Sequence, residues 1–337
     1  MAASIAILGA GAWGTALAVH LAARMPVTLW ARNAAHASAM AAARENARYL
    51  PGITLPASVA VTADLRAAVR ARTLVVATPM AGLPELARDA AAAGARAPLA
   101  WLSKGFVDAP ALPAGVGIAH QVLAAQWTAP LAVVSGPSFA EEVARRLPTA
   151  LVVASGDAAF ARDLSGLLRS DTLRAYDSRD IVGVEVGGAI KNVLAIAAGA
   201  SDGLGFGQNA RAALITRGLA EATRLAVAFG GDPRTLMGLA GLGDLVLTCT
   251  GDLSRNRRVG LALARGDSLP SILAALGHVA EGVPAARAAR ALAVHHGLDM
   301  PIAHAVYRVL YEDKDPREAV RSLMQREPTS EGPGFEV

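Results

Sequence analysis

Residues 4–14 read SIAILGAGAWG and decide the fold of the N-terminal half of the chain. The run from Ser4 to Leu8 is apolar and has the length of a buried strand, and the alanine- and leucine-rich stretch after it has the composition of a helix. Between the two, Gly9, Gly11 and Gly14 satisfy the spacing G-x-G-x-x-G. A strand, a glycine-rich turn and a helix in this order predict the first half of a βαβ unit.

Each of the three glycines has a distinct role at such a turn. Gly9 allows the tight turn, Gly11 lets the backbone approach a pyrophosphate, and Gly14 lets helix and strand pack closely. The amides at the helix N-terminus then face the negative charge. The spacing alone recurs by chance, and a glycine-rich turn without a ligand is the alternative. Because a second strand follows at Pro26 to Trp30, the context predicts a dinucleotide site.

The rest of the chain falls into two regions. Strand-like runs alternate with alanine-rich helical stretches, which implies a doubly wound parallel sheet. After about Asp180 helical periodicity dominates as far as Met324. We expect an α/β fold with a parallel-sheet dinucleotide-binding (Rossmann) domain at 1–180, an all-helical substrate and catalytic domain at 181–326 and a frayed tail at 327–337. The further expected strands are Thr73 to Ala77, Leu99 to Ser103, Leu131 to Ser135, Ala150 to Ala154 and Leu173 to Tyr176.

Composition narrows the classes of partner. The net charge is +4 and the pI is near 9.6, but the arginines are scattered among carboxylates and only 4% of residues are aromatic. A nucleic-acid surface needs a basic patch and stacking side chains, so we expect no nucleic-acid partner. An excess of positive charge also suits a protein that binds an anionic small molecule.

The sequence also argues against three classes of protein: membrane-spanning, secreted and metal-binding proteins. No uninterrupted apolar run reaches the roughly 18 residues that span a bilayer, and no basic residue precedes Arg24, as a signal peptide would require. The single cysteine, Cys249, cannot form an internal disulfide. No histidine and carboxylate set has metal-ligand spacing. We expect a soluble, cytoplasmic protein without a metal.

Almost all basic residues of the chain are arginines. Only three of the 32 lysines and arginines are lysines, namely Lys104, Lys191 and Lys314. Only an amine can lose its proton near neutrality, so the retained lysines are candidates for proton chemistry. Lys314 lies between Asp313 and Asp315 and is explained as an ordinary surface lysine.

The end of the second strand bears on the choice of cofactor. An NAD-selective fold places an acidic residue there to bind the ribose 2′-hydroxyl, yet the first acidic residue of this chain is Glu45. Arg32 stands at the expected place and could pair with a 2′-phosphate. We therefore expect NADPH as the cofactor, with NADH also accepted. Stacking of Arg32 on adenine, with loose selectivity, is the alternative.

A second group of motifs lies in the helical half. Lys191 sits in VEVGGAIKNVLAIAAG, residues 184–199, where partial burial would lower its pKa into the range useful for proton transfer. A lysine whose stem crosses apolar surface to reach solvent is the alternative. The polar run Ser254 to Arg258 resembles a phosphate cradle, although a solvated helix start also explains it, above all for Arg257 and Arg258. Nearer the N-terminus, Ser138 and Glu141 have the spacing of a capping box.

At this point the chain resembles the bacterial NAD(P)-dependent glycerol-3-phosphate dehydrogenases. The matching segments extend over nearly the whole length of the chain, and they occur in the same order as in the family. It implies reversible reduction of dihydroxyacetone phosphate to sn-glycerol 3-phosphate, a supply for glycerophospholipid synthesis, and a homodimer. The matching segments are GAGAWGTALA, LSKGF, SGPSFAEEV, GGAIKNVLAIAAG, NARAALITRGLAE, GLGDLVLTC, SRNRR and VAEGV.

The resemblance also implies roles for individual residues. Ala12 departs from the family, where many members carry serine. Lys191 is the expected general acid in reduction and base in oxidation, and the charge of Asp244 would raise its pKa while burial lowers it. The cofactor contacts are Gly9, Gly11, Ala12, Trp13, Gly14, Arg32, Lys104, Ala140, Arg255, Val279 and Glu281. The substrate contacts are Lys104, Gly136, Ser138, Lys191, Asp244, Ser254, Arg255 and Asn256.

Two other functions fit parts of the sequence. A reductase of another small anionic ketone or hydroxy acid would share the scaffold, and the Ser254 to Arg258 segment indicates only that the substrate is anionic. A non-catalytic NADPH-sensing protein would need the glycines but not Lys191 in its motif.

Overall fold

The computed structural model describes residues 4–277 and 279–326. The chain divides into two compact units, the first ending at Ser103 and resuming over Ala119–Ile181, the second made of Lys104–Ile118 and the chain from Val182. The segment 104–118, predicted in the first domain, thus groups with the second unit. Its side chains explain this, because Phe106 and Ile118 are buried in the second unit's core. The predicted tail 327–337 lies outside the described residues.

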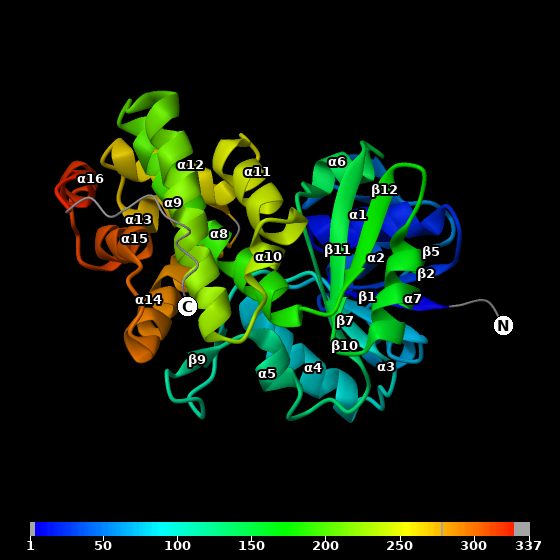
Figure 1. The fold of residues 1–337 in the computed structure, drawn as a ribbon. Helices are drawn as coiled ribbons and strands as arrows, with labels where there is room; N and C mark the ends of the chain where they lie inside the picture. Colours follow the sequence, from blue (N-terminus) through cyan, green and yellow to red (C-terminus); the bar gives the residue numbers. More distant parts are fainter. Residues whose placement is uncertain (1–3, 278, 327–337) are drawn as a thin grey trace. The chain divides into compact units, whose positions relative to one another are not determined.

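The first unit contains an eight-stranded sheet in the order β12-β11-β10-β7-β6-β1-β2-β5 (Figure 1). Every predicted strand is present, and β5 is an addition that sequence analysis missed. The sheet strands are β1 (Ile5–Leu8), β2 (Val27–Trp30), β5 (Val59–Thr62), β6 (Thr73–Val76), β7 (Leu99–Trp101), β10 (Leu131–Ser135), β11 (Thr149–Ser155) and β12 (Leu173–Ser178).

One pairing departs from the predicted parallel sheet. Strands β10 and β11 are antiparallel, whereas the other recorded pairs of this sheet are parallel. The chain between them contains only the short helix α6 (Ala140–Ala144) and returns directly along the neighbouring strand. An antiparallel neighbour needs no crossover helix packed on the sheet. The fold is therefore doubly wound and mostly parallel, with this one reversal.

Helices and a small hairpin complete the first unit around a core of buried aliphatic side chains. The helices are α1 (Ala12–Ala22), α2 (Ala34–Ala43), α3 (Leu65–Ala68), η1 (Met80–Gly82), α4 (Leu83–Ala92), α5 (Ala119–Leu123), α6 and α7 (Ala158–Leu168). The hairpin pairs β3 (Glu45–Asn46) with β4 (Leu50–Thr54).

The second unit is helical apart from one short hairpin, β8 (Val107–Asp108) with β9 (Val116–Gly117). From 182 onward its described residues contain no strand, as predicted. The helices are α8 (Ile181–Gly203), α9 (Gly207–Ala228), α10 (Pro233–Leu236), the π-helical turn η2 (Leu239–Gly243), α11 (Asp244–Thr250), α12 (Arg255–Ala264), α13 (Leu269–Leu276), α14 (Gly282–His296), α15 (Pro301–Tyr311) and α16 (Pro316–Met324).

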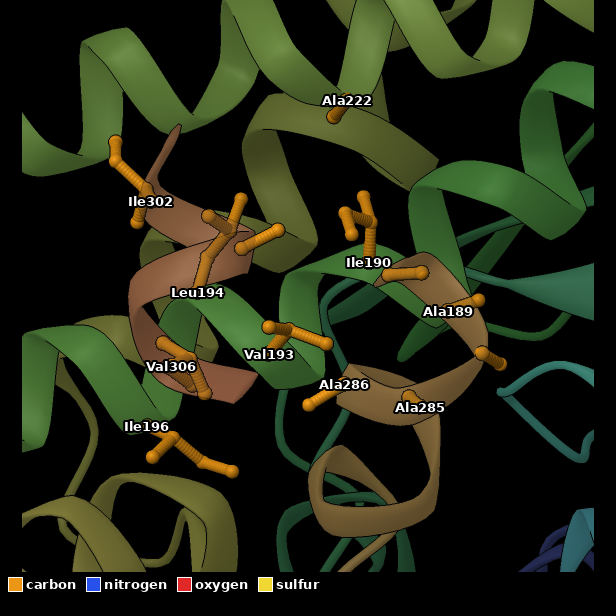
Figure 2. Packing of buried hydrophobic residues seen from close by; sticks show 14 of the residues in the cluster. Ala189, Ile190, Val193, Leu194, Ile196, Ala222, Ala285, Ala286, Ile302 and Val306 are labelled. Atoms are coloured by element: carbon orange, nitrogen blue, oxygen red, sulfur yellow. The ribbon is translucent and has the colours of Figure 1, made fainter. Parts of the chain in front are cut away.

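Helix α8 is the central element of this unit. Ile190, Val193 and Leu194 project from α8 among side chains of α9, α14 and α15, including Ala286 and Val306 (Figure 2). By length and mean hydropathy α8 is apolar enough to cross a bilayer, but Glu185 and Lys191 interrupt its apolar residues, and 83% of its apolar window is buried inside the protein. It packs as the core helix of the second unit.

Candidate active site

The glycine-rich turn has the backbone geometry that its sequence predicts. Gly9 has φ +124°, and a Cβ there would lie 2.8 Å from the carbonyl oxygen of Ala77. A Cβ on Gly14 would lie 1.9 Å from the carbonyl oxygen of Gly9. Both positions therefore require glycine.

The N-terminus of α1 is open at this turn. Gly11 is the N-cap and provides no side-chain acceptor, and the nearest atom that a Cβ there would meet is the Ala77 oxygen, at 3.9 Å. Ala12 and Trp13 begin the helix, whose first turn has no acidic residue. The turn lies where the strand order reverses between β1 and β6, the usual position of ligands on such sheets. Open amides and space for a backbone approach fit the pyrophosphate of a dinucleotide.

Two side chains hold the turn in place. Asn46, fully buried in the short strand β3, donates to the carbonyl oxygen of Ala10 at 2.9 Å and to Thr15 Oγ1 at 2.7 Å. Trp13 Nε1 donates to the carbonyl oxygen of Ser138 at 3.1 Å. Sequence analysis missed Asn46, because a two-residue strand leaves no periodicity from which to find it.

Arg32 is exposed directly after β2, and the next residue, Asn33, caps α2 by accepting from the amide of His36 at 2.8 Å. Arg32 therefore directly follows the end of the second strand, where selectivity for the ribose is decided in such folds. Its pairing with a 2′-phosphate stays a prediction.

The predicted capping box at Ser138 is wrong. Helix α6 begins at Ala140, its N-cap is Phe139, and no side chain caps it. Ser138 lies one residue too early and instead donates from Oγ to the carbonyl oxygen of Gly136 at 2.9 Å. Gly136 has φ +135°, and a Cβ there would meet the Ala150 oxygen at 3.0 Å.

Lys104, Lys191 and Asp244, far apart in sequence, meet inside the second unit. Lys191 Nζ lies 2.5 Å from Asp244 Oδ1, and Lys104 Nζ lies 2.7 Å from Asp244 Oδ2. Lys191 is 7% exposed and Asp244 is 1% exposed. The alternative of a solvent-reaching lysine is therefore wrong for Lys191. One buried carboxylate holds two ammonium groups, so the cluster carries a net positive charge.

The surroundings of the cluster shift both of its buried titratable groups. Burial lowers the pKa of Lys191 to about 8, although the Asp244 charge opposes this shift and Lys104 adds to it. Burial by itself would raise the pKa of Asp244, but the charges and hydrogen bonds of the two lysines hold it below its usual value. The sequence did not show whether burial or the Asp244 charge has the larger effect on the pKa of Lys191. Burial has the larger effect, so the ammonium of Lys191 can release a proton near neutrality.

Two further side chains belong to the cluster and were not singled out from the sequence. Thr248 Oγ1 accepts from Lys191 Nζ at 2.9 Å and donates to the carbonyl oxygen of Asp244 at 2.6 Å. Asn192 donates from Nδ2 to the carbonyl oxygen of Lys104 at 3.2 Å. Thr248 follows Asp244 by one helical turn, and that spacing was the signal available in the sequence.

The predicted phosphate cradle is the start of α12. Ser254 is its N-cap and accepts from the Arg257 amide at 3.2 Å. Asn256 donates to Asn192 Oδ1 at 2.9 Å and accepts from the Gly282 amide at 3.0 Å. The side chains of Ser254 and Asn256 therefore shape the cradle. Arg255 is exposed, and no acceptor is recorded among the described residues for its backbone amide.

Three other residues that the sequence analysis named are Arg257, Val279 and Glu281. Arg257 pairs with Asp202 and Asp252, so its guanidinium is already neutralised, but its side chain is only 13% exposed and is not the solvated group that the alternative expected. Arg258 is exposed, in agreement with that alternative. Val279 is 45% exposed, and Glu281 is the N-cap of α14. Glu281 thus adjoins Gly282, which donates to Asn256.

Comparisons with known proteins match this combination of units. Residues 4–161 match the family model of the NAD-dependent glycerol-3-phosphate dehydrogenase N-terminus, and residues 180–321 match that of its C-terminus. The chain is 55% identical to the glycerol-3-phosphate dehydrogenase [NAD(P)+] of Aromatoleum aromaticum, covering 97% of this chain and 99% of that protein. The corresponding protein of Methylibium petroleiphilum is also 55% identical, covering 97% and 98%.

A solved structure agrees over both units. The glycerol-3-phosphate dehydrogenase of Coxiella burnetii superimposes with a TM-score of 0.91 at 44% identity, covering 96% of this chain and 99% of that one. Family models over both halves, and relatives matched nearly end to end, leave no large part of the chain unassigned. The chain belongs to the NAD-dependent glycerol-3-phosphate dehydrogenase family, whose members are oxidoreductases.

Proposed function

We propose that the chain catalyses the reversible reduction of dihydroxyacetone phosphate to sn-glycerol 3-phosphate, a precursor of glycerophospholipids. The observation that carries this proposal is the buried Lys104–Asp244–Lys191 cluster on the helical unit of a glycerol-3-phosphate dehydrogenase fold. The nicotinamide of a bound dinucleotide would supply a hydride to the ketone carbon. The side chains of this chain then have to manage the negative charge and the proton.

Lys191 is the proposed general acid. Reduction turns the ketone oxygen into an alkoxide, which needs a positive donor and then a proton. With a pKa of about 8, Lys191 is largely protonated at neutral pH and gives up its proton readily. Asp244 keeps the ammonium in place, and the second positive charge of Lys104 keeps the cluster attractive to an anionic substrate. In oxidation, neutral Lys191 takes the hydroxyl proton back.

The start of α12 is the proposed phosphate site. Backbone amides at a helix N-terminus favour an anion, and the Arg255 guanidinium offers paired donors to phosphate oxygens. Asn256 ties this helix start to Asn192, the residue next to Lys191. Binding of the remote phosphate would therefore orient the carbonyl toward the proton donor.

NADPH is the proposed cofactor, with NADH also accepted. The open N-terminus of α1 would hold the pyrophosphate, and Arg32 at the end of β2 would meet the 2′-phosphate. The relatives are named as NAD(P)+ enzymes, which agrees with the use of both cofactors.

We further propose that the protein works as a cytoplasmic homodimer that needs no metal, membrane or nucleic acid. The family resemblance supports the dimer, and the single cysteine, Cys249, is buried and free, so nothing requires an oxidising compartment. Light scattering on the purified protein would test the dimer.

The deciding experiment compares two substrates with NADPH oxidation as the readout. We expect strong turnover with dihydroxyacetone phosphate and little with unphosphorylated dihydroxyacetone. The variant Arg255→Ala should raise KM for the phosphorylated substrate by about 10-fold or more, because it removes a charge-assisted phosphate contact. Equal activity on the two substrates would overturn the substrate assignment and leave the fold untouched.

A further inference from the structure

We propose that Asp202 is a positioning residue for substrate binding, which acts through Arg257 to hold the start of α12 beside Lys191. The inference rests on the proposed function, since it concerns the phosphate site at Arg255 and Asn256. Asp202 itself lies at the end of α8 and is not proposed to touch the substrate.

Asp202 is the acceptor for two arginines from different helices. Arg257 Nε and Nη2 donate to its Oδ2 at 3.0 and 2.7 Å, and Arg211 Nη1 donates to the same oxygen at 2.9 Å. The side chains of Asp202 and Arg257 are 12% and 13% exposed. Charge-assisted bonds that are largely withdrawn from water hold geometry better than exposed ion pairs do.

The two helices joined by this ion pair are in backbone contact. A Cβ on Gly199 of α8 would lie 2.0 Å from the carbonyl oxygen of Arg257, and a Cβ on Gly260 of α12 would lie 2.0 Å from that of Ile196. At these two points the backbones themselves are in contact, so α12 has little freedom to move away from α8. The polar contacts beside this crossing add a restraint on how far α12 slides or turns on α8.

The contacts form a two-point attachment. Asn256 bonds to Asn192, immediately after Lys191, while the adjacent Arg257 bonds to Asp202, further along α8. Arg255, the first residue of α12, directly precedes both attachment residues. Both attachments stand on the helix that carries Lys191. Together they fix the distance between the phosphate cradle and the proton donor.

Loss of Asp202 should therefore affect binding more than chemistry. Two arginines would lose their common acceptor and repel each other. Arg257 would keep Asp252, which lies in the turn before α12 and does not connect that helix to α8. For Asp202→Asn we expect KM for dihydroxyacetone phosphate to rise by about 10-fold, because small displacements of an orienting group are costly. We expect kcat to change by less than about 3-fold, because Lys191 and Asp244 keep their contacts.

The test uses three variants of the full chain, assayed with both substrates and NADPH. Asp267→Asn is the matched control, because Asp267 pairs with Arg265 at the opposite end of α12 through an exposed ion pair of 3.2 Å. Asp202→Glu keeps the charge and should recover part of the loss. Melting temperature and the NADPH dissociation constant are measured for each variant, and Arg257→Lys replaces Asp202→Asn if the latter does not fold.

The outcomes are distinct. A rise in KM confined to the phosphorylated substrate, absent in Asp267→Asn and reduced in Asp202→Glu, supports the proposal. An unchanged KM in Asp202→Asn, or equal losses with both substrates and a lower melting temperature, overturns it and makes Asp202 a purely structural residue. If the wild-type protein itself shows no preference for the phosphorylated substrate, it is the proposed function that fails.

Discussion

At the scale of single residues, the ionisation of Lys191 is the feature with the most direct consequence. Its ammonium is buried beside one carboxylate and one other ammonium group, and burial brings its pKa down to about 8. An exposed lysine, with a pKa of about 10.4, would stay charged over the usual range of assay pH. Lys191 can therefore exist in both forms under ordinary assay conditions.

The two directions of the reaction should consequently have opposite pH profiles. If Lys191 is the acid, as proposed, reduction needs its protonated form, so kcat/KM with dihydroxyacetone phosphate should fall as the pH rises through about 8. Oxidation needs the neutral amine, so kcat/KM with glycerol 3-phosphate should rise through the same value. Initial rates measured across this range in both directions, at constant ionic strength, check the sign and the midpoint.

The control is Lys191→Arg, which keeps the positive charge but cannot lose its proton. Whatever activity it retains should lack the inflection near pH 8. Persistence of the same inflection in this variant would assign it to another group and remove Lys191 as the titrating acid.

At the scale of elements, a buried carboxylate joins two helices of the second unit. Glu221 of α9 is 1% exposed and accepts from the amides of Ile302 and Ala303 at 2.7 and 3.0 Å. These amides belong to the first turn of α15, which has no side-chain cap of its own. Burial raises the pKa of Glu221 to about 7, although both amides, and Arg224, act in the opposite direction.

Glu221 should make stability depend on pH. Its pKa is higher in the folded protein than in the unfolded chain, so the folded state binds the proton more tightly. Its contribution to the free energy of unfolding is thus fully present below about pH 4.5 and is lost as the pH rises through about 7. Relative to Glu221→Gln, the wild type should lose up to about 3 kcal/mol between pH 5 and 8.

Urea unfolding of both proteins at the two pH values measures this difference. The control is Glu312→Gln, whose carboxylate is exposed and pairs with Arg308, four residues earlier in the chain. Its difference from the wild type should hardly depend on pH. An equally constant difference for Glu221→Gln would mean that Glu221 is ionised throughout.

The elements also show how far sequence patterns reach. Apolar runs such as Thr73 to Val76 were found because they are buried on both faces and flanked by helices. Strand β5 was missed because only Val59 of its four residues is buried. The antiparallel pairing of β11 was also missed, since a short connection through α6 leaves no signature of strand direction.

At the scale of the whole molecule, the Lys104–Asp244–Lys191 cluster depends on contacts that no local sequence pattern contains. Lys104 and Asp244 were expected near Lys191 from family resemblance, and their meeting on one carboxylate is a product of tertiary folding. The transfer of residues 104–118 to the second unit has the same origin, because it follows from the burial of Phe106 and Ile118 in that unit's core. The residue types and their chemistry could be predicted from the sequence, but which of these side chains meet is decided by tertiary packing.

The two units should respond differently to the two ligands. The first amides of α1 and of α12 have no acceptor within their helices and should exchange rapidly in the free protein. NADPH should slow exchange near Gly11, and glycerol 3-phosphate alone should slow it near Arg255. At a ligand concentration of about 100 times the dissociation constant, the protection can reach about 100-fold, equivalent to about 2.7 kcal/mol.

Hydrogen exchange followed by mass spectrometry measures both regions, and α7 serves as the internal reference. Protection near Gly11 by glycerol 3-phosphate alone would place the phosphate site in the first unit and contradict the assignment of Arg255. Slowing of exchange at 279–281 by NADPH would support the cofactor contacts proposed for Val279 and Glu281.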